Sequence, residues 1–119
     1  MTKIYLAIPY SGMEHESMEI STQVAAYLMQ QGHFVLSPIT LSHPIAMKGN
    51  LPTHWEYWKE LDKWLISCCE EVWITDLGQE RISRSKGVQE EIQIAHNTDK
   101  TIRYICPMTY EISDKPINK

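Results

Sequence analysis

The sequence predicts an α/β fold in which strands and helices alternate within one domain spanning residues 1–119. Short apolar segments of β-strand character recur along the chain, and segments whose apolar residues follow helical spacing lie between them. Proline and glycine mark most of the junctions. A single domain is expected because two hydrophobic cores in a chain of 119 residues would each be too small to be stable.

The first predicted strand is Lys3–Ile8, and it ends at Pro9. A helix should then begin near Gly12, because residues 11–14 follow the Ser-x-x-Glu pattern of a capping box. Gly32 is the expected end of this helix. The apolar residues that define its buried face are Ile20, Val24, Tyr27 and Leu28.

The middle of the chain is predicted to contain a strand, a long irregular loop and a second helix. The strand is His33–Leu36, and the loop is Ser37–Pro52, where proline and glycine recur and no periodicity is visible. Loops of this length inside a compact domain are usually either functional or disordered. Residues 53–56 repeat the capping-box pattern, so the second helix should begin there and continue to about Cys68.

The last third of the chain contains two further predicted strands and one helix. The strands are Glu71–Thr75 and Thr101–Ile105, and the helix between them is Gly87–Asn97. Residues 76–85 are predicted to form a polar loop, and the tail after Pro107 carries no strong signal.

This β-α-β-α-β-α-β order predicts a flavodoxin-like or Rossmann-like three-layer sandwich. Its sheet should have four or five strands, mainly parallel, with helices on both faces and right-handed crossovers. Ligands of such sheets bind in the crevice beyond the carboxyl ends of the strands. The segments expected to meet there are residues 9–12, 37–52 and 76–86.

Composition limits the classes of function. A net charge of −4 and a pI of 5.7 argue against binding of nucleic acid through its phosphates. No segment approaches the roughly 18 apolar residues of a membrane span, and residues 1–9 do not resemble a signal peptide, so we expect a cytoplasmic protein. The cysteines lack metal-ligand spacing and indicate reduced thiols, although pairing of Cys106 with Cys68 or Cys69 stays open. Neither a metal nor a cofactor is expected.

Helical phase separates two adjacent carboxylates in the last predicted helix. At about 100° per residue, Val88, Ile92 and Ala95 form its buried stripe. Glu91 lies roughly 60° from Val88, at the border of the stripe, whereas Glu90 lies roughly 160° away and should point to solvent. Near the first turn, Glu91 would be stabilised as an anion and could act as a nucleophile. The alternative is a glutamate that only complements the helix dipole.

Three blocks of sequence follow, in order and spacing, the motifs of one enzyme superfamily. They are Tyr5–Tyr10 on the first strand and turn, Leu61–Leu65 with the strand Val72–Ile74, and Ser85–Ile92 with Ala95. Together they resemble the nucleoside 2-deoxyribosyltransferases over about residues 3–105. The chain is most similar to a small bacterial and phage branch of that superfamily. The further marks of this branch are Pro9-Tyr10-Ser11, Ser37-Pro38-Ile39, Ser42–Ala46 and Trp55–Trp58.

The resemblance implies roles for three residues. Glu91 would be the nucleophile that attacks C1′ of the sugar and forms a covalent glycosyl intermediate, with retention of configuration. Tyr5 would orient Glu91 through its hydroxyl group. Asp62 would contact the base, or protonate it as it leaves, which requires a raised pKa. Water or a second base would then accept the sugar.

The resemblance also implies a nucleoside or nucleotide substrate. Where the transferases usually carry a sugar-binding aspartate, this chain has Ser85, as in the branch that hydrolyses deoxynucleoside 5′-monophosphates. Free N–H groups at the start of the helix suit a phosphate, and Arg81, Arg84 and Lys86 lie beside it. The residues expected to bind substrate are Pro9, Tyr10, Ser11, Gly12, His43, Ser85, Lys86 and Gly87.

Several of these residues have simpler interpretations. Ser11, which with Gly12 could form a second anion site, could equally be a plain helix cap. The basic cluster could be a solvated loop, and His43 could be a histidine held by a local hydrogen bond rather than one that binds base or sugar. Trp55 and Trp58 are more typical of a core or a subunit interface than of a base-stacking surface.

The sequence therefore favours an enzyme that cleaves an N-glycosidic bond or transfers a (deoxy)ribosyl group. One alternative is a non-catalytic module that binds a nucleotide or nucleotide-derived signal on the same scaffold, and another is an inactive assembly subunit. Membership of the superfamily would imply a homodimer or larger homo-oligomer, and the aromatic residues at 55–58 make an interface plausible.

Overall fold

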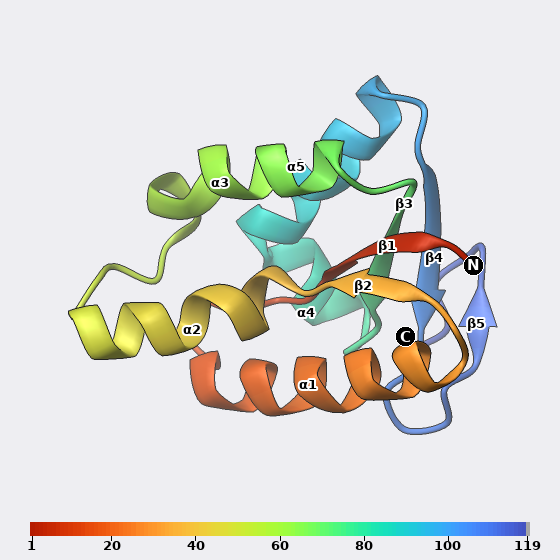
Figure 1. The fold of residues 1–119 in the computed structure, drawn as a ribbon, viewed down its shortest axis with the longest axis horizontal. Coiled ribbons are helices and arrows are strands. Elements are labelled where there is room, and N and C mark those ends of the chain that lie inside the picture. The colour runs from red at the N-terminus through yellow and green to blue at the C-terminus, as the bar shows by residue number, and fades with distance from the viewer. Residues whose placement is uncertain (119) are drawn as a thin grey trace.

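A five-stranded sheet forms the centre of the molecule in the computed structural model, which describes residues 1–118 (Figure 1). The strand order is β2-β1-β3-β4-β5, with the first four strands parallel and β5 antiparallel to β4. The strands are β1 (Lys3–Ala7), β2 (Phe34–Leu36), β3 (Glu71–Thr75), β4 (Thr101–Ile105) and β5 (Ile112–Ser113). The predicted α/β class with a mainly parallel sheet is confirmed.

Helices cover both faces of the sheet. The helix α1 (Glu14–Gln30) packs on one face, where Val24 and Leu28 meet Ile4 and Trp73. On the other face lie α3 (Trp55–Ser67), α4 (Gln79–Arg84) and α5 (Lys86–Asn97). The helix α2 (Pro38–Gly49) contacts α1 and the end of β1 (Figure 1). Because β1 and β3 are buried on both sides, their sequences are apolar without polar alternation.

The strand order places a topological switch point between β1 and β3. The chain leaves β1 for β2 on one side of the sheet, and then crosses to β3 on the other side. The connections therefore diverge beyond the carboxyl ends of β1 and β3, which is where doubly wound sheets bind ligands.

The predicted loop Ser37–Pro52 is wrong, because most of it forms α2. Ser37 caps this helix by accepting a hydrogen bond from the Thr40 N–H at 3.4 Å, and Pro38 occupies its first turn, where a missing N–H costs nothing. Pro44 lies inside the helix and has no N–H for the Thr40 carbonyl. This internal proline concealed the helix from an argument based on periodicity.

Both predicted capping boxes are also wrong. The helix α1 begins at Glu14 rather than near Gly12, and no side chain caps its N-terminus. The Glu14 carboxylate instead accepts the Gly12 N–H at 2.7 Å, which ties the turn before the helix. The helix α3 begins at Trp55 with His54 as an N-cap that makes no side-chain bond, one residue later than the pattern requires.

Three smaller outcomes complete the comparison with sequence. The predicted polar loop 76–85 contains the short helix α4, and the tail adds β5 as an edge strand beside β4. All three cysteine thiols are free, with Cys68 exposed and Cys69 and Cys106 buried. No helix within residues 1–118 is long and apolar enough to cross a membrane.

Candidate active site

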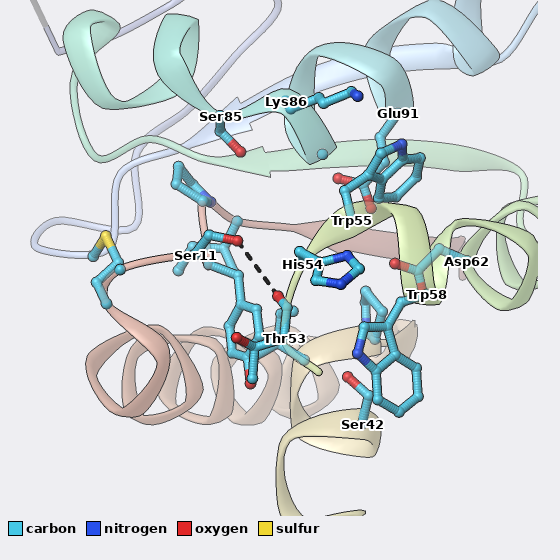
Figure 2. A pocket seen from close by; sticks show the side chains of 18 of the residues that line it. Ser11, Ser42, Thr53, His54, Trp55, Trp58, Asp62, Ser85, Lys86 and Glu91 are labelled. Atoms are coloured by element: carbon cyan, nitrogen blue, oxygen red, sulfur yellow. Dashed lines mark hydrogen bonds between the residues drawn. The ribbon is translucent and has the colours of Figure 1, made fainter. Parts of the chain in front are cut away.

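A cleft of about 620 Å³ opens at the switch point. Its walls come from the turn after β1, the start of α2, the start of α3, and the α4–α5 region (Figure 2). The three segments expected to meet in the crevice do meet there, although only the first part of 37–52 contributes. The start of α3 is a fourth wall that the sequence did not predict.

Glu91 and Tyr5 form a hydrogen-bonded pair at the floor of this cleft. Tyr5 lies on β1 and is fully buried, and its hydroxyl group donates to Oε2 of Glu91. Glu91 lies on α5, lines the cleft and is only 4% exposed. The contact predicted between these two residues is confirmed, and so is the choice of Glu91 over Glu90 as the cleft-facing carboxyl.

The electrostatic state of Glu91 differs from the expectation. Glu91 belongs to the second turn of α5, which begins at Lys86, so the helix N-terminus does not hold it as an anion. Burial, followed by the charge of Asp62, raises its pKa to about 8, while the Tyr5 hydrogen bond lowers it. Burial therefore favours the protonated carboxyl in the ligand-free protein, whereas the sequence argument expected an ionised one.

Asp62 places a second buried carboxyl in the same cleft. It lies on α3, is 6% exposed and lines the cleft, as the sequence predicted. Burial raises the pKa of Asp62 to about 7, and the Tyr5 hydroxyl partly offsets this effect. Its Oδ1 is buried without a hydrogen-bond partner among the described residues, although buried polar atoms are normally paired.

The raised pKa values of Glu91 and Asp62 predict that the protein loses stability in mild alkali. Both carboxyls ionise near pH 4 in the unfolded chain, but in the folded protein they hold their protons up to about pH 8 and 7. The unfolded chain binds fewer protons over this interval, so the free energy of unfolding falls as pH rises through it. We expect the melting temperature to be lower by about 4 °C or more at pH 9 than at pH 5.

Differential scanning calorimetry across pH 5–9 checks this expectation. The matched control is the double variant Glu91→Gln with Asp62→Asn, which keeps both shapes and cannot ionise at either position. Its melting temperature should vary much less over the same pH range. An equal slope in the wild type and the double variant would show that other groups cause the loss.

Helical phase predicted that Glu90 points to solvent, but in the structure its side chain is only partly exposed. It is half-buried, and its Oε2 has no hydrogen-bond partner in the part of the chain that the structure describes. Packing of α3 against α5 covers a face that an isolated helix would expose. Glu90 is nevertheless absent from the cleft lining.

The cationic side of the cleft lies where α5 begins. Ser85 is the N-cap of α5 and accepts the Val88 N–H at 3.2 Å. Lys86 pairs with Glu56 at 2.5 Å, and Arg84 pairs with Glu80 at 3.0 Å. The remaining cleft cation, Arg81, has no carboxylate within ion-pair distance among residues 1–118, and its nearest polar contact is the sulfur of Met13 at 4.0 Å. The cluster is therefore partly neutralised, with Arg81 available to a ligand.

The turn Pro9–Gly12 lines the cleft as predicted, but it does not form a second anion site. The Gly12 N–H is already bonded to Glu14, and Glu14 and Glu16 place two negative charges in the first turn of α1. The Ser11 hydroxyl faces the carbonyl of Thr53 at 3.4 Å instead (Figure 2). These carboxylates would repel an anion.

His43 does not line this cleft, which argues against the predicted contact with base or sugar. It lies on α2, is 6% exposed, and its Nδ1 pairs with the Tyr10 hydroxyl at 2.7 Å. Its ring borders a separate, shallower hollow on the α1 side, lined also by Glu14 and His15. Tyr10 does line the main cleft, so His43 affects the cleft through the Tyr10 ring, whose hydroxyl group it contacts.

Trp55 and Trp58 both line the cleft rather than lying in the core, and a subunit interface at these residues stays a prediction. Gly87 explains the position of Trp55. A Cβ atom on Gly87 would lie 3.3 Å from Cε3 of the Trp55 ring, so glycine lets the ring lie against α5. The spacing of Trp55, Trp58 and Asp62 along one face of α3 was the sequence signal for this wall.

The fold and the site together define a doubly wound α/β protein with an acidic pair and a tyrosine at its switch-point cleft. No group of three His, Cys, Asp or Glu side chains suited to a metal ion occurs in the described chain. The chain belongs to the family described as Domain of unknown function (DUF1937), which matches residues 2–106 and thus spans the whole cleft. No curated protein matches the chain.

Proposed function

We propose that the protein cleaves the N-glycosidic bond of a nucleoside or nucleoside 5′-monophosphate, or transfers its sugar, with Glu91 as the nucleophile. The observation that carries this proposal is the buried pair of Glu91 and Tyr5, with the second carboxyl of Asp62 in the same cleft. Retaining glycosidases use two carboxyl groups in one cleft, one as the nucleophile and one as the acid. The likeness of the surrounding motifs to nucleoside 2-deoxyribosyltransferases supports the same reading.

The proposed reaction has two steps. A carboxylate oxygen of Glu91 bonds to C1′ as the bond from C1′ to the base nitrogen breaks, and the base takes a proton from Asp62. Water, or a second base, then attacks C1′, releases Glu91 and returns a proton to Asp62. Tyr5 stabilises the Glu91 carboxylate by its hydrogen bond and is a positioning residue beneath the cleft.

The reaction requires Glu91 ionised and Asp62 protonated, and burial raises the pKa of both carboxyls into the neutral range. One proton held by the pair can therefore lie on Asp62, which is the reactive state, without any change in the total charge. A substrate that develops positive charge at C1′ beside Glu91 would favour this state.

The size and lining of the cleft support a nucleotide-sized substrate. Its volume of about 620 Å³ is typical of small-molecule sites. One wall carries Trp55 and Trp58, which can contact a base, and another carries Arg81 near the N-terminus of α5, which suits a phosphate.

The experiment that tests this proposal is incubation with the common deoxynucleosides and their 5′-monophosphates, followed by chromatography for free base. Acid quenching and mass spectrometry of the peptide that contains Glu91 would detect the glycosyl ester. If no substrate in this panel releases base, the proposed reaction is wrong.

A second candidate function is a nucleotide-binding module without turnover. The deep burial of Glu91, which is 4% exposed, favours this alternative, because burial raises the pKa of the carboxyl and a protonated carboxyl is a poor nucleophile. A nucleotide that raises the melting temperature while releasing no base would establish this alternative.

Arg81→Gln is predicted to weaken the binding of 5′-monophosphates about ten-fold while changing nucleoside binding little. The reason is that Arg81 is the cleft cation without an ion-pair partner among the described residues, and charged hydrogen bonds to phosphate are strong. Arg84→Gln is the matched comparison, because Arg84 already pairs with Glu80 at 3.0 Å. Isothermal titration calorimetry gives both affinities, and equal losses in the two variants would contradict a specific role for Arg81.

We further propose a cytosolic homodimer or larger homo-oligomer. Three free thiols suit a reducing compartment. Apolar side chains that stay exposed on α2 and α3 offer a contact surface, and they are Leu41, Ile45, Met47, Tyr57 and Trp64. Analytical ultracentrifugation that finds only monomer would refute the assembly.

A further inference from the structure

His54 presents a free imidazole ring to the cleft. Its side chain lines the cleft and is exposed, so a bound ligand can reach it. The ring has no hydrogen-bond or ion-pair partner within residues 1–118. By contrast, Ser85, Lys86 and Arg84 line the same cleft but are already bonded within the protein. The imidazole of His54 therefore has bonding capacity that is left for solvent or a ligand.

The place of His54 on α3 makes this free state unfavourable for the helix. His54 is the N-cap of α3, a position where Ser, Thr, Asp or Asn usually accepts a backbone N–H of the first turn. Here the N-cap side chain makes no such bond, although its φ of −90° and ψ of 155° are the extended values that a capping residue adopts. A good capping residue would fit this backbone and stabilise α3. Stability that is given up at a cleft-facing residue is typical of functional positions.

The backbone on the N-terminal side of His54 is held in place. The carbonyl of Thr53 accepts the Ser11 hydroxyl group at 3.4 Å. The carbonyl of Pro52 accepts the indole N–H of Trp58 at 2.7 Å. The segment that leads into α3 is therefore fixed before a ligand binds, and the imidazole is its free part. A contact with this ring needs little further ordering of the backbone.

The His54 ring lies between the two ends of the cleft. Figure 2 shows Ser85 and Lys86, at the start of α5, on one side of the ring, and Ser42 of α2 on the other. The proposed phosphate position is at the start of α5, where Arg81 is available to a ligand. A nucleotide with its phosphate there and its base directed towards α2 brings its sugar, the middle part of the molecule, to His54.

We infer that His54 is a specificity-determining residue, whose imidazole forms a hydrogen bond with a hydroxyl group on the sugar of a bound nucleotide. The inference rests on the proposed function for the class of ligand. An imidazole ring carries an N–H donor in either protonation state, and a sugar hydroxyl group can accept it. A ligand that lacks this hydroxyl group loses the bond, so the cleft discriminates against it.

The test replaces His54 by serine, which can cap α3 but is too short to replace the imidazole, and separately by alanine, which can do neither. His15→Ala is the matched control, because His15 is an exposed histidine outside this cleft. Affinities for the ribo-, 2′-deoxy- and 2′,3′-dideoxynucleoside 5′-monophosphates of the four common bases are measured by calorimetry. These proteins all carry Glu91→Gln, so that turnover does not interfere, and base release is measured separately with Glu91 intact.

With His54 present, removal of the contacted hydroxyl group from the ligand should weaken binding about three- to ten-fold, the range that one lost hydrogen bond produces. This step falls either between the ribo- and deoxynucleotide or between the deoxy- and dideoxynucleotide. In both His54 variants the same step should shrink below about two-fold, because the hydroxyl group no longer has its partner. His15→Ala should keep the full step.

The melting temperatures of the ligand-free variants give a second readout, in the opposite direction. His54→Ser should melt about 2–5 °C higher than His54→Ala, since serine caps α3, and no lower than the protein with His54. A histidine that serves only the fold would instead make both variants less stable than the protein with His54, and that result would contradict the inference.

The outcomes separate this inference from the proposed reaction. Steps of the same size with and without His54 overturn the inference, even if base is released normally. A step that is lost in both His54 variants, without base release by any protein, supports the inference and overturns the reaction. Failure of every monophosphate to bind the protein with His54 overturns both.

Discussion

Glu91→Gln is expected to lower the rate of base release by at least about a thousand-fold while leaving the fold intact. Glutamine has nearly the same shape as a protonated glutamate, and its carbonyl oxygen can still accept the Tyr5 hydroxyl group. It cannot form the ester with C1′, so the covalent route is closed. The measurement is single-turnover release of free base, with the melting temperature as a check on folding.

The pKa of Glu91 gives this variant a second signature. The wild-type protein must ionise a buried carboxyl whose pKa is raised to about 8, and this ionisation costs stability as pH rises. Glutamine has no such cost. Glu91→Gln should therefore be at least as stable as the wild type at pH 9, although it is inactive. Functional sites often contain catalytic residues that lower the stability of the folded protein.

Glu90→Gln is the matched control for this prediction. Glu90 is the adjacent residue, carries the same charge and lies outside the cleft lining. Its replacement should change base release less than about three-fold, because its side chain does not reach the cleft. Comparable losses in the two variants, or residual turnover above one hundredth of the wild-type rate in Glu91→Gln, would contradict a covalent role for Glu91.

The geometry of the Glu91 and Tyr5 pair was accessible from sequence because both residues lie on regular elements. Strand alternation fixes the side of the sheet that Tyr5 faces, and helical phase separates Glu91 from Glu90. The motif resemblance then brought the two elements together. Local periodicity and one long-range likeness were sufficient for this part of the site.

The ionisation state of Glu91 was not accessible in the same way. The sequence argument placed it near the first turn of its helix, whereas α5 begins at Lys86 and puts it in the second turn. Moreover, the largest influence on its pKa is burial, followed by the hydrogen bond from Tyr5 on β1 and then by the charge of Asp62 on α3. Desolvation depends on packing between elements, which a single segment of sequence does not encode.

The walls of the cleft were missed for related reasons. Pro44 obscured α2, so His43 was expected in an irregular loop rather than on a helix that turns it towards Tyr10. Trp55 was assigned to a core or interface because nothing in its own segment reveals that Gly87 leaves space for its ring. In both cases the deciding contact joins residues far apart in the chain.

Asp62→Asn is expected to lower the rate of base release by roughly 10²–10⁴-fold for ordinary bases, which need a proton to leave. Burial raises the pKa of Asp62 to about 7, so the wild type holds an available proton near neutral pH, whereas an amide at this position has none to give. A substrate with a 7-methylated guanine should be affected far less, because its base departs as a neutral molecule without protonation.

The dependence of the rate on pH provides an independent test of Asp62 as the acid, with the same variant. Glu91 must be ionised and Asp62 protonated, so the wild-type rate should rise and then fall with pH, with apparent pKa values that belong to the coupled pair near 7 and 8. Asp62→Asn removes the acid and should remove the falling limb, leaving a rate that rises with the ionisation of Glu91 alone. If the variant keeps the falling limb, or loses as much rate with the methylated base as with ordinary ones, Asp62 only shapes the cleft and another group protonates the base.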